Sequence, residues 1–181
     1  RVANGNATVI SPTSSSTTAQ IYSDAKILAV YEVDSGGGDN YYAGIRRSSY
    51  GLTSKNSDDA WWAQNAIDYA NSLQSVKSPT IPVVIQIVSG YLDSSGNTEF
   101  EFSKPSSYTG STANMVFQQN GIDHERALDV YDQMGVKAII QLESGNANVV
   151  DALEVAHLKF GHHPCIIGYG IDAEWYLCYE S

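Results

Sequence analysis

No run of 18 or more apolar residues occurs in the sequence, so it predicts no transmembrane helix. Basic residues are few as well: the chain has 10 of them against 20 acidic residues, which gives a net charge of −10. This charge argues against binding to nucleic-acid phosphates, which needs a basic face. Charged residues make up only 17% of the chain, and 12 Tyr and 15 Gly make it unlike a disordered acidic tail. We expect a folded, acidic, soluble domain whose partners include neither a membrane nor a nucleic acid.

Several common catalytic motifs are also missing. Residues 36–38 are a glycine run that lacks the G-x-G-x-x-G spacing, and neither a G-x-S-x-G elbow nor a Cys–His nucleophile pair occurs. His124 and His157 have no His or Cys partner at ligand spacing, and no loop has the EF-hand pattern. The pair His162-His163 precedes an apolar run, at the end opposite to the acidic residues discussed below. We therefore predict no metal site and no cofactor.

The chain has only two cysteines, Cys165 and Cys178. A strand that starts at Cys165 rises roughly 3.3 Å per residue and carries the two thiols apart, whereas a disulfide needs Cα atoms within about 7 Å. We expect Cys165 to be a buried free thiol, and the pairing of Cys178 stays open.

The first 22 residues differ in composition from the rest. Residues 11–18 are seven Ser or Thr and one Pro, which cannot contribute to a core. Asn6-Ala7-Thr8 is the single N-glycosylation sequon of the chain. We predict a Ser/Thr-rich leader or linker over 1–22 with Asn6 as a glycosylation site, followed by a domain over 23–181. These features favour a secreted, extracellular protein.

Short apolar runs alternate with helical patterns along the rest of the chain. Continuous apolarity indicates strands buried on both faces, as in parallel sheets covered by helices. The helices are expected to begin near Ser57, Asp123 and Asn148 and to end near Gly135 and Gly161. Gly96-Asn97 further suggests a hairpin between 88–91 and 98–102. The predicted order is β-α-β-α-β-α-β, an α/β fold with strands over 26–34, 82–89, 137–144 and 164–172 and helices over 58–74, 123–134 and 148–160.

Polar residues gather where the predicted strands end, and side chains two apart share a face of a strand. The pairs are Glu32 with Asp34, Gln86 with Val88, Gln141 with Glu143, and Asp172 with Glu174. Ligands of parallel α/β folds bind at this carboxyl end of the strands. We expect these side chains to line a cleft.

The sharpest part of this pattern is the segment from Asp172 to Tyr176. A carboxyl group beside an aromatic wall holds its proton and can act as a general acid, and a second carboxylate two residues back can assist it. Flat aromatic faces at Trp175, Tyr176 and Tyr91 suit sugar rings. A neutral, polyhydroxylated substrate therefore fits this cleft best, and carbohydrate is the predicted partner.

The same segment resembles the fourth strand of the family 18 glycoside hydrolases, the chitinases and endo-N-acetylglucosaminidases. That strand ends in D-x-x-D-x-D-x-E in a TIM barrel, where the Glu is the general acid and the preceding Asp assists the acetamido group of the substrate. Glu174 and Asp172 match the last two positions, whereas Gly170 and Ile167 stand where the other two Asp would be. The resemblance implies a TIM-barrel glycosidase with Glu174 and Asp172 as its catalytic residues.

A complete (β/α)₈ barrel takes about 250 residues, and the four predicted strands amount to its N-terminal half. We expect the polypeptide to continue beyond Ser181, and self-association is expected if it ends there. The leading hypothesis is a secreted glycoside hydrolase with carboxylate acid/base catalysis, and a retaining nucleophile would then lie outside this sequence. Two alternatives remain open: a non-catalytic carbohydrate-binding or structural protein on a barrel scaffold, and an open α/β sheet carrying a metal-dependent hydrolase. The predicted substrate-binding residues are Glu32, Asp34, Gln86, Tyr91, Gln141, Glu143, Trp175 and Tyr176.

Overall fold

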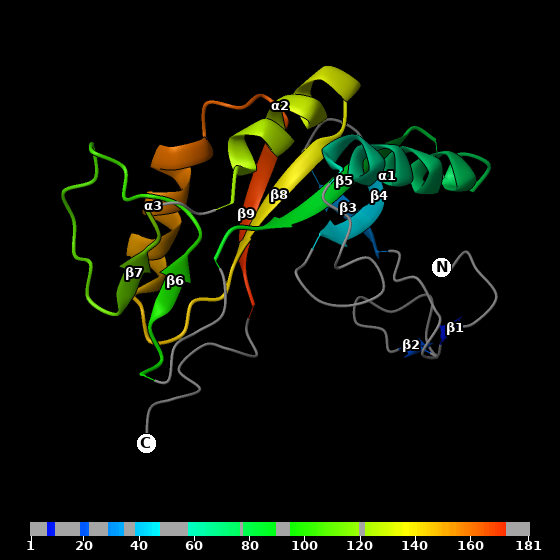
Figure 1. The fold of residues 1–181 in the computed structure, drawn as a ribbon. Helices are drawn as coiled ribbons and strands as arrows, with labels where there is room; N and C mark the ends of the chain where they lie inside the picture. The colour runs from blue at the N-terminus through cyan, green and yellow to red at the C-terminus, as the bar shows by residue number, and fades with distance from the viewer. Residues whose placement is uncertain are drawn as a thin grey trace. The chain divides into compact units, whose positions relative to one another are not determined.

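The structure, a computed structural model, describes residues 7–9, 19–21, 29–34, 39–47, 58–76, 78–89, 95–119 and 122–172 (Figure 1). Side-chain surroundings are described from residue 40 onward within these ranges. The chain forms two compact units, Arg1–Val84 and Ile85–Ser181, and each is considered separately. The unit boundary falls within strand β5 (Thr80–Ile87), and hydrogen bonding gives the main sheet the order β3-β4-β5-β8-β9. The fold is α/β, as the sequence predicts.

The first unit contains two antiparallel strand pairs and one helix. β1 (Ala7–Val9) pairs with β2 (Ala19–Ile21), and β3 (Ala29–Asp34) pairs with β4 (Asp39–Arg47). The prediction of a parallel first strand was therefore wrong here, because the chain returns at once as the antiparallel β4. Tyr41 and Ala43 are buried at alternate positions of β4, which is the period of a half-buried strand. The polar and tyrosine-rich composition of this strand hid that period.

Helix α1 (Asp59–Leu73) covers β4 with a stripe of small and large apolar residues. Its N-cap is Asp58, whose carboxylate accepts a hydrogen bond from the Ala60 amide at 3.0 Å. The predicted cap, Ser57, lies outside the described residues. Ala70 and Leu73 pack against Ala43 of β4, so local capping and the apolar stripe together place the helix on the sheet.

The second unit contains the parallel strands β8 (Lys137–Leu142) and β9 (Ile166–Ile171), with α2 (His124–Met134) before β8 and α3 (Val149–Phe160) between them. Both helices begin at the predicted caps, Asp123 and Asn148, whose side chains accept hydrogen bonds from first-turn amides. Gly135 ends α2 with φ at 70°, the left-handed conformation that favours glycine. The βα order of this unit is confirmed almost to the residue.

The helices cover only one face of β8 and β9. Ala138, Ile140 and Leu142 of β8 are fully buried, whereas the alternate positions Ile139 and Gln141 are partly exposed. The predicted burial on both faces was therefore wrong for this strand. The apolar residues of the second face are present, but no described segment covers them as completely as α2 and α3 cover the first.

A folded excursion joins β5 to α2. It contains β6 (Thr98–Phe100) and β7 (Met115–Phe117), which pair in parallel. Within the described residues, the predicted hairpin is present as one antiparallel bridge between Ser89 and Phe100. The ring centroids of Phe100 and Phe117 lie 5.0 Å apart in a stacked arrangement, and those of Phe102 and Phe160 of α3 lie 4.9 Å apart in an edge-on arrangement. This aromatic cluster packs the excursion against α3 and buries large rings.

Among the described residues, no helix has the length and apolar character needed to cross a membrane.

Candidate functional site

The predicted site at the carboxyl ends of β8 and β9 brings together three of its polar residues. Gln141 donates a hydrogen bond from its amide nitrogen to the Asp172 carboxylate at 3.2 Å. The Asp172 amide donates to the Leu142 carbonyl at 2.7 Å, which extends the parallel ladder to the last described residue. Glu143, the residue directly after β8, is 9% exposed. The strand-end pattern in the sequence therefore does place Gln141, Glu143 and Asp172 at one edge.

These side chains lie on the face of β8 and β9 away from the helices. Tyr169 pairs with Ile140, and its hydroxyl forms a hydrogen bond with His157 of α3, so the odd-numbered residues of β9 face the helices. Gly170 pairs with Gln141, so the even-numbered residues face the other side. Apart from its chain neighbours, no described residue has an atom within 4 Å of a methyl group built on Gly168 or Gly170. The described part of the chain therefore leaves space beside these glycines, on the face that carries the polar residues.

Gln86, which the sequence placed in the cleft, lies instead in the interior with 2% of its surface exposed. Its amide oxygen accepts from the Tyr131 hydroxyl at 3.0 Å, and its nitrogen lies 3.3 Å from the Ile87 carbonyl and 3.1 Å from His124 Nδ1. Both amide hydrogens are thus engaged within the protein. Gln86 therefore links β5 to α2 by hydrogen bonds.

The same network fixes the tautomer of His124. A carbonyl oxygen can only accept, so the Ile87 carbonyl orients the amide nitrogen of Gln86 toward itself and toward His124 Nδ1. Nδ1 must then accept, and the proton sits on Nε2, which donates to Glu101 at 3.0 Å. Because both ring nitrogens are occupied, this buried imidazole links α2 to the excursion and has no nitrogen left to serve as a base.

Side-chain hydrogen bonds hold the loops around the carboxyl end of β8. The Ser89 hydroxyl accepts from the Glu143 amide at 2.5 Å, and the Thr98 hydroxyl donates to the Ser144 carbonyl at 2.5 Å. Asn114 donates to the Asn146 carbonyl at 2.9 Å. The excursion that contains β6 and β7 is therefore bound to the loop that follows β8, next to the predicted site.

The side chains of the other predicted site residues lie outside the described set. Glu32 and Asp34 lie in β3, opposite Tyr41 and Asp39 of β4, and their side chains are outside the described set. The remaining positions also lie outside the described residues: Asn6, Tyr91, Glu174, Trp175, Tyr176 and Cys178.

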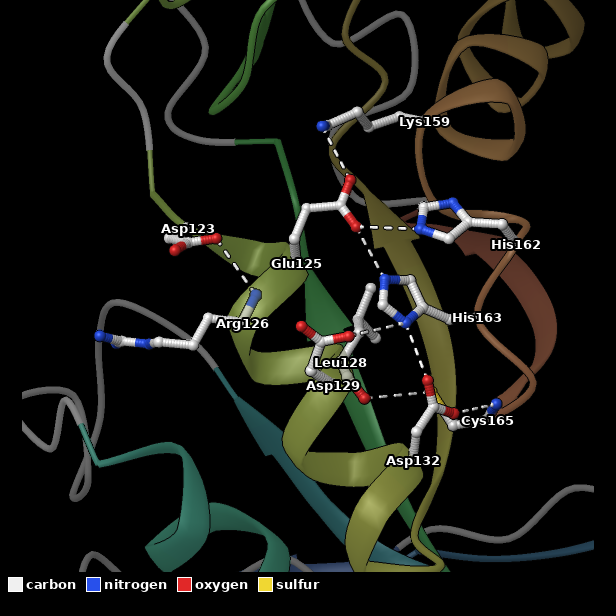
Figure 2. Close-up of polar contacts among 10 residues, drawn as sticks. All are labelled: Asp123, Glu125, Arg126, Leu128, Asp129, Asp132, Lys159, His162, His163 and Cys165. Atoms are coloured by element: carbon white, nitrogen blue, oxygen red, sulfur yellow. Dashed lines mark hydrogen bonds and ion pairs between the residues drawn. The ribbon is translucent and has the colours of Figure 1, made fainter.

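A second polar cluster, which the sequence did not predict, surrounds His163 just before β9 (Figure 2). The imidazole Nε2 lies 2.7 Å from the carboxylate of Glu125, and Nδ1 lies 2.8 Å from that of Asp132. Both carboxylates come from α2. Lys159 of α3 and His162 also contact Glu125, at 2.8 and 3.3 Å. His163 itself is 5% exposed.

The charges in this cluster stabilise one another. Burial alone would lower the pKa of His163, but hydrogen bonds to Glu125 and Asp132 outweigh it and raise that pKa above its ordinary value. Burial would raise the pKa of the Glu125 and Asp132 carboxyls. Hydrogen bonds from Lys159 and His163 nevertheless lower the pKa of Glu125. Hydrogen bonds from His163 and Cys165 likewise lower the pKa of Asp132. The described arrangement is that of an imidazolium held between two carboxylates.

Cys165 adjoins the cluster as the expected buried free thiol. Its amide donates to Asp132 at 2.6 Å, and its thiol donates to the Leu128 carbonyl at 3.7 Å. Burial, together with the Asp132 carboxylate, raises the pKa of the thiol to about 12. The thiol is thus protonated at neutral pH and is no nucleophile.

One pattern in the sequence could have revealed this cluster. Glu125, Asp129 and Asp132 follow the i, i+4, i+7 spacing of one helix face, and the pair His162-His163 stands directly before a strand. Which helix faces that pair depends on tertiary packing, and no local spacing encodes it.

Comparison with models of known protein families, with curated proteins and with solved structures gave no match.

Proposed function

We propose that this chain provides part of the active site of a secreted TIM-barrel glycoside hydrolase that acts by carboxylate acid/base catalysis. One observation carries the proposal. Asp172 stands at the carboxyl end of β9, on the face that no described helix covers, with its carboxylate held by Gln141 and with no described residue other than chain neighbours over Gly168 and Gly170. Ligands of parallel α/β folds bind at this end of the strands.

The proposed roles follow from this placement. Glu174 is the general acid that protonates the glycosidic oxygen, and Asp172, oriented by the amide of Gln141, assists it. Glu143 lies one strand away at the same edge and binds sugar hydroxyls. The aromatic residues Trp175 and Tyr176 stack on sugar rings. Gln86 is left out of the cleft, because its amide is engaged in the interior.

The one-sided cover of β8 and β9 supports the barrel form of the proposal. In a closed barrel, helices cover the outer face of each strand, and side chains from the other strands fill the interior. Within the described residues, α2 and α3 cover one face, while Ile139, Gln141 and Asp172 on the other face stay partly exposed. Further strands of the same barrel would bury this second face.

Glu174→Gln tests the catalytic role, because it keeps the shape of the side chain and removes the acid. The purified native protein is assayed for reducing ends released from a panel of β-linked polysaccharides. Activity should fall by roughly 10² to 10⁴, the contribution of a positioned acid. Glu154→Gln is the matched control, since Glu154 is an exposed carboxylate on α3, and it should leave the rate unchanged.

The same assay separates the proposal from a non-catalytic carbohydrate-binding protein. Gly170 and Ile167 in place of two acidic residues favour this second function, because they leave the strand with half of the acidic series. A binding protein would retain glycan on an affinity matrix in both variants and release no reducing ends. Hydrolysis that persists within a few-fold in Glu174→Gln would refute the assignment of the acid.

A further inference from the structure

We propose that His162, His163 and Glu125 form a binding site for a divalent transition metal, zinc by their ligand chemistry. The inference is independent of the proposed glycosidase function. It concerns the entrance to β9, whereas Asp172 lies at the exit of that strand, and the six residues of β9 span roughly 20 Å.

The three ligand atoms converge on one point. His162 Nε2 and His163 Nε2 lie 3.3 and 2.7 Å from the same oxygen of Glu125, and all three atoms lie within 4.8 Å of one another (Figure 2). Ligands on a tetrahedral zinc at 2.0–2.1 Å are about 3.3 Å apart. Two imidazoles and one glutamate with an open fourth position are a known zinc ligand set. Small side-chain movements would bring all three into that geometry.

The hydrogen-bond partners of the three proposed ligands are also of the kind found around bound metals. A metal-bound imidazole usually donates its second N–H to a carboxylate, which fixes the ring and raises its basicity. His163 Nδ1 has such a partner in Asp132 at 2.8 Å, and Asp132 is itself held by the Cys165 amide at 2.6 Å. Lys159 engages the other oxygen of Glu125 at 2.8 Å, which leaves the first oxygen for the metal. A bound metal would replace the hydrogen bond between His163 Nε2 and Glu125, and these two atoms would have to move apart from 2.7 Å to about 3.3 Å.

Access and charge also suit the site. The His162 side chain is 64% exposed and that of Glu125 is 32% exposed, so a hydrated cation can reach them. A second set, Asp129, Asp132 and His163, would use Nδ1, but it offers only one imidazole, and Asp129 lies 3.8 Å from that nitrogen. Imidazole nitrogen favours zinc over the oxygen-preferring calcium and magnesium. The first set is therefore the stronger one.

The site can be tested by titrating the full chain, freed of metal with a chelator, with Zn²⁺ in a calorimeter and with Co²⁺ in a visible spectrometer. We expect one saturable site for each chain and Co²⁺ absorption bands of the intensity typical of four-coordinate ions. His162→Gln should weaken Zn²⁺ binding at least about tenfold, because it removes a ligand. Asp132→Asn should weaken it about 10- to 100-fold, the effect of losing a carboxylate behind a ligating His.

His157→Gln is the matched control, since His157 is an exposed histidine of α3 that bonds to Tyr169 outside the cluster. It should leave the affinity unchanged. Because His162 is exposed, its replacement should not unfold the chain, and far-UV circular dichroism checks this. The proposal is overturned if the wild type shows no saturable binding or if His162→Gln binds Zn²⁺ as well as the wild type. It is also overturned if Asp129→Asn, rather than His162→Gln, removes the site.

Discussion

At the scale of single residues, His163 shows how buried charge depends on its partners. Each of its two ring nitrogens lies within hydrogen-bond distance of a carboxylate, that of Glu125 or that of Asp132, so both nitrogens of the imidazole have a partner. A buried ion pair is costly to break from one side, since the remaining charges lose their partner. The cluster connects α2 and α3 to the start of β9 and should matter for stability with or without a metal.

The stabilising effect of this cluster should depend on pH in a defined direction. The pKa of His163 is raised, so its contribution is complete below the ordinary histidine value of 6.5 and is lost as pH rises through the higher folded value. The pKa values of Glu125 and Asp132 are lowered from 4.5 and 3.8, so their contribution is present above these values and is lost at lower pH. The effect is therefore largest between about pH 5 and pH 6.5.

In the presence of a chelator, His163→Gln should lower the free energy of unfolding by about 1.5–3 kcal/mol at pH 5.5, the range for hydrogen bonds to charged groups. The loss should shrink toward pH 9, because the wild-type imidazole releases its proton as the pH rises through its raised pKa. Urea unfolding at both pH values measures it, and His157→Gln serves as control. A loss that is equal at both pH values, or larger at pH 9, would contradict the charged state assigned to His163.

The sequence predicts some single residues well and others not at all. Asp172 and Gln141 could be placed at one edge because a strand end and a period of two are local properties. The engagement of Gln86 by Tyr131 and His124 could not be predicted, since these partners lie 45 and 38 residues away along the chain. Only the packing of α2 on the sheet brings them together.

At the scale of elements, α2 and α3 follow from local chemistry. Asp123 and Asn148 cap their first turns, and Gly135 takes the left-handed conformation that stops α2. β4 was missed although it begins only five residues after the end of β3, because Tyr41 and Ala43 alternate among residues typical of loops. The pairing of β6 with β7 was not predicted, because the turn residues near Gly96 give no sign of it.

Two glycines in different strands should respond in opposite ways to the same added methyl group. On Gly170 of β9 it would meet no atom of a described residue beyond the chain neighbours within 4 Å, whereas on Gly44 of β4 it would collide with the Val83 carbonyl. Gly170→Ala should raise the free energy of unfolding by about 0.4–1 kcal/mol through the entropy of the unfolded chain. Gly44→Ala should lower it by about 1–3 kcal/mol through overpacking.

Thermal and urea unfolding of these two variants measure both effects. A marked loss of stability in Gly170→Ala would mean that the space beside Asp172 is filled, and the proposed sugar-binding face would then be closed. A neutral Gly44→Ala would mean that the approach of β4 to Val83 is looser than the structure describes.

At the scale of the whole molecule, the decisive feature is the face of β8 and β9 that no described helix covers. Helices cover one side, and polar residues stand at the carboxyl ends on the other. The parallel strands and the α/β class were predictable, because apolar runs alternate with capped helices. The barrel remains a proposal, since its closure depends on strands that the described residues do not contain.

The most direct test of this account is the location of the glycan on the chain. Amide NMR spectra of uniformly ¹⁵N-labelled Glu174→Gln, which prevents turnover, are followed during titration with β-1,4-linked oligosaccharides of N-acetylglucosamine, glucose and xylose. We expect saturable shifts confined to residues 141–144 and 168–172 and to the segment after them, with α2 and α3 unchanged. Shifts confined to α2, α3 and residues 161–165, or no shift with any of these sugars, would contradict it.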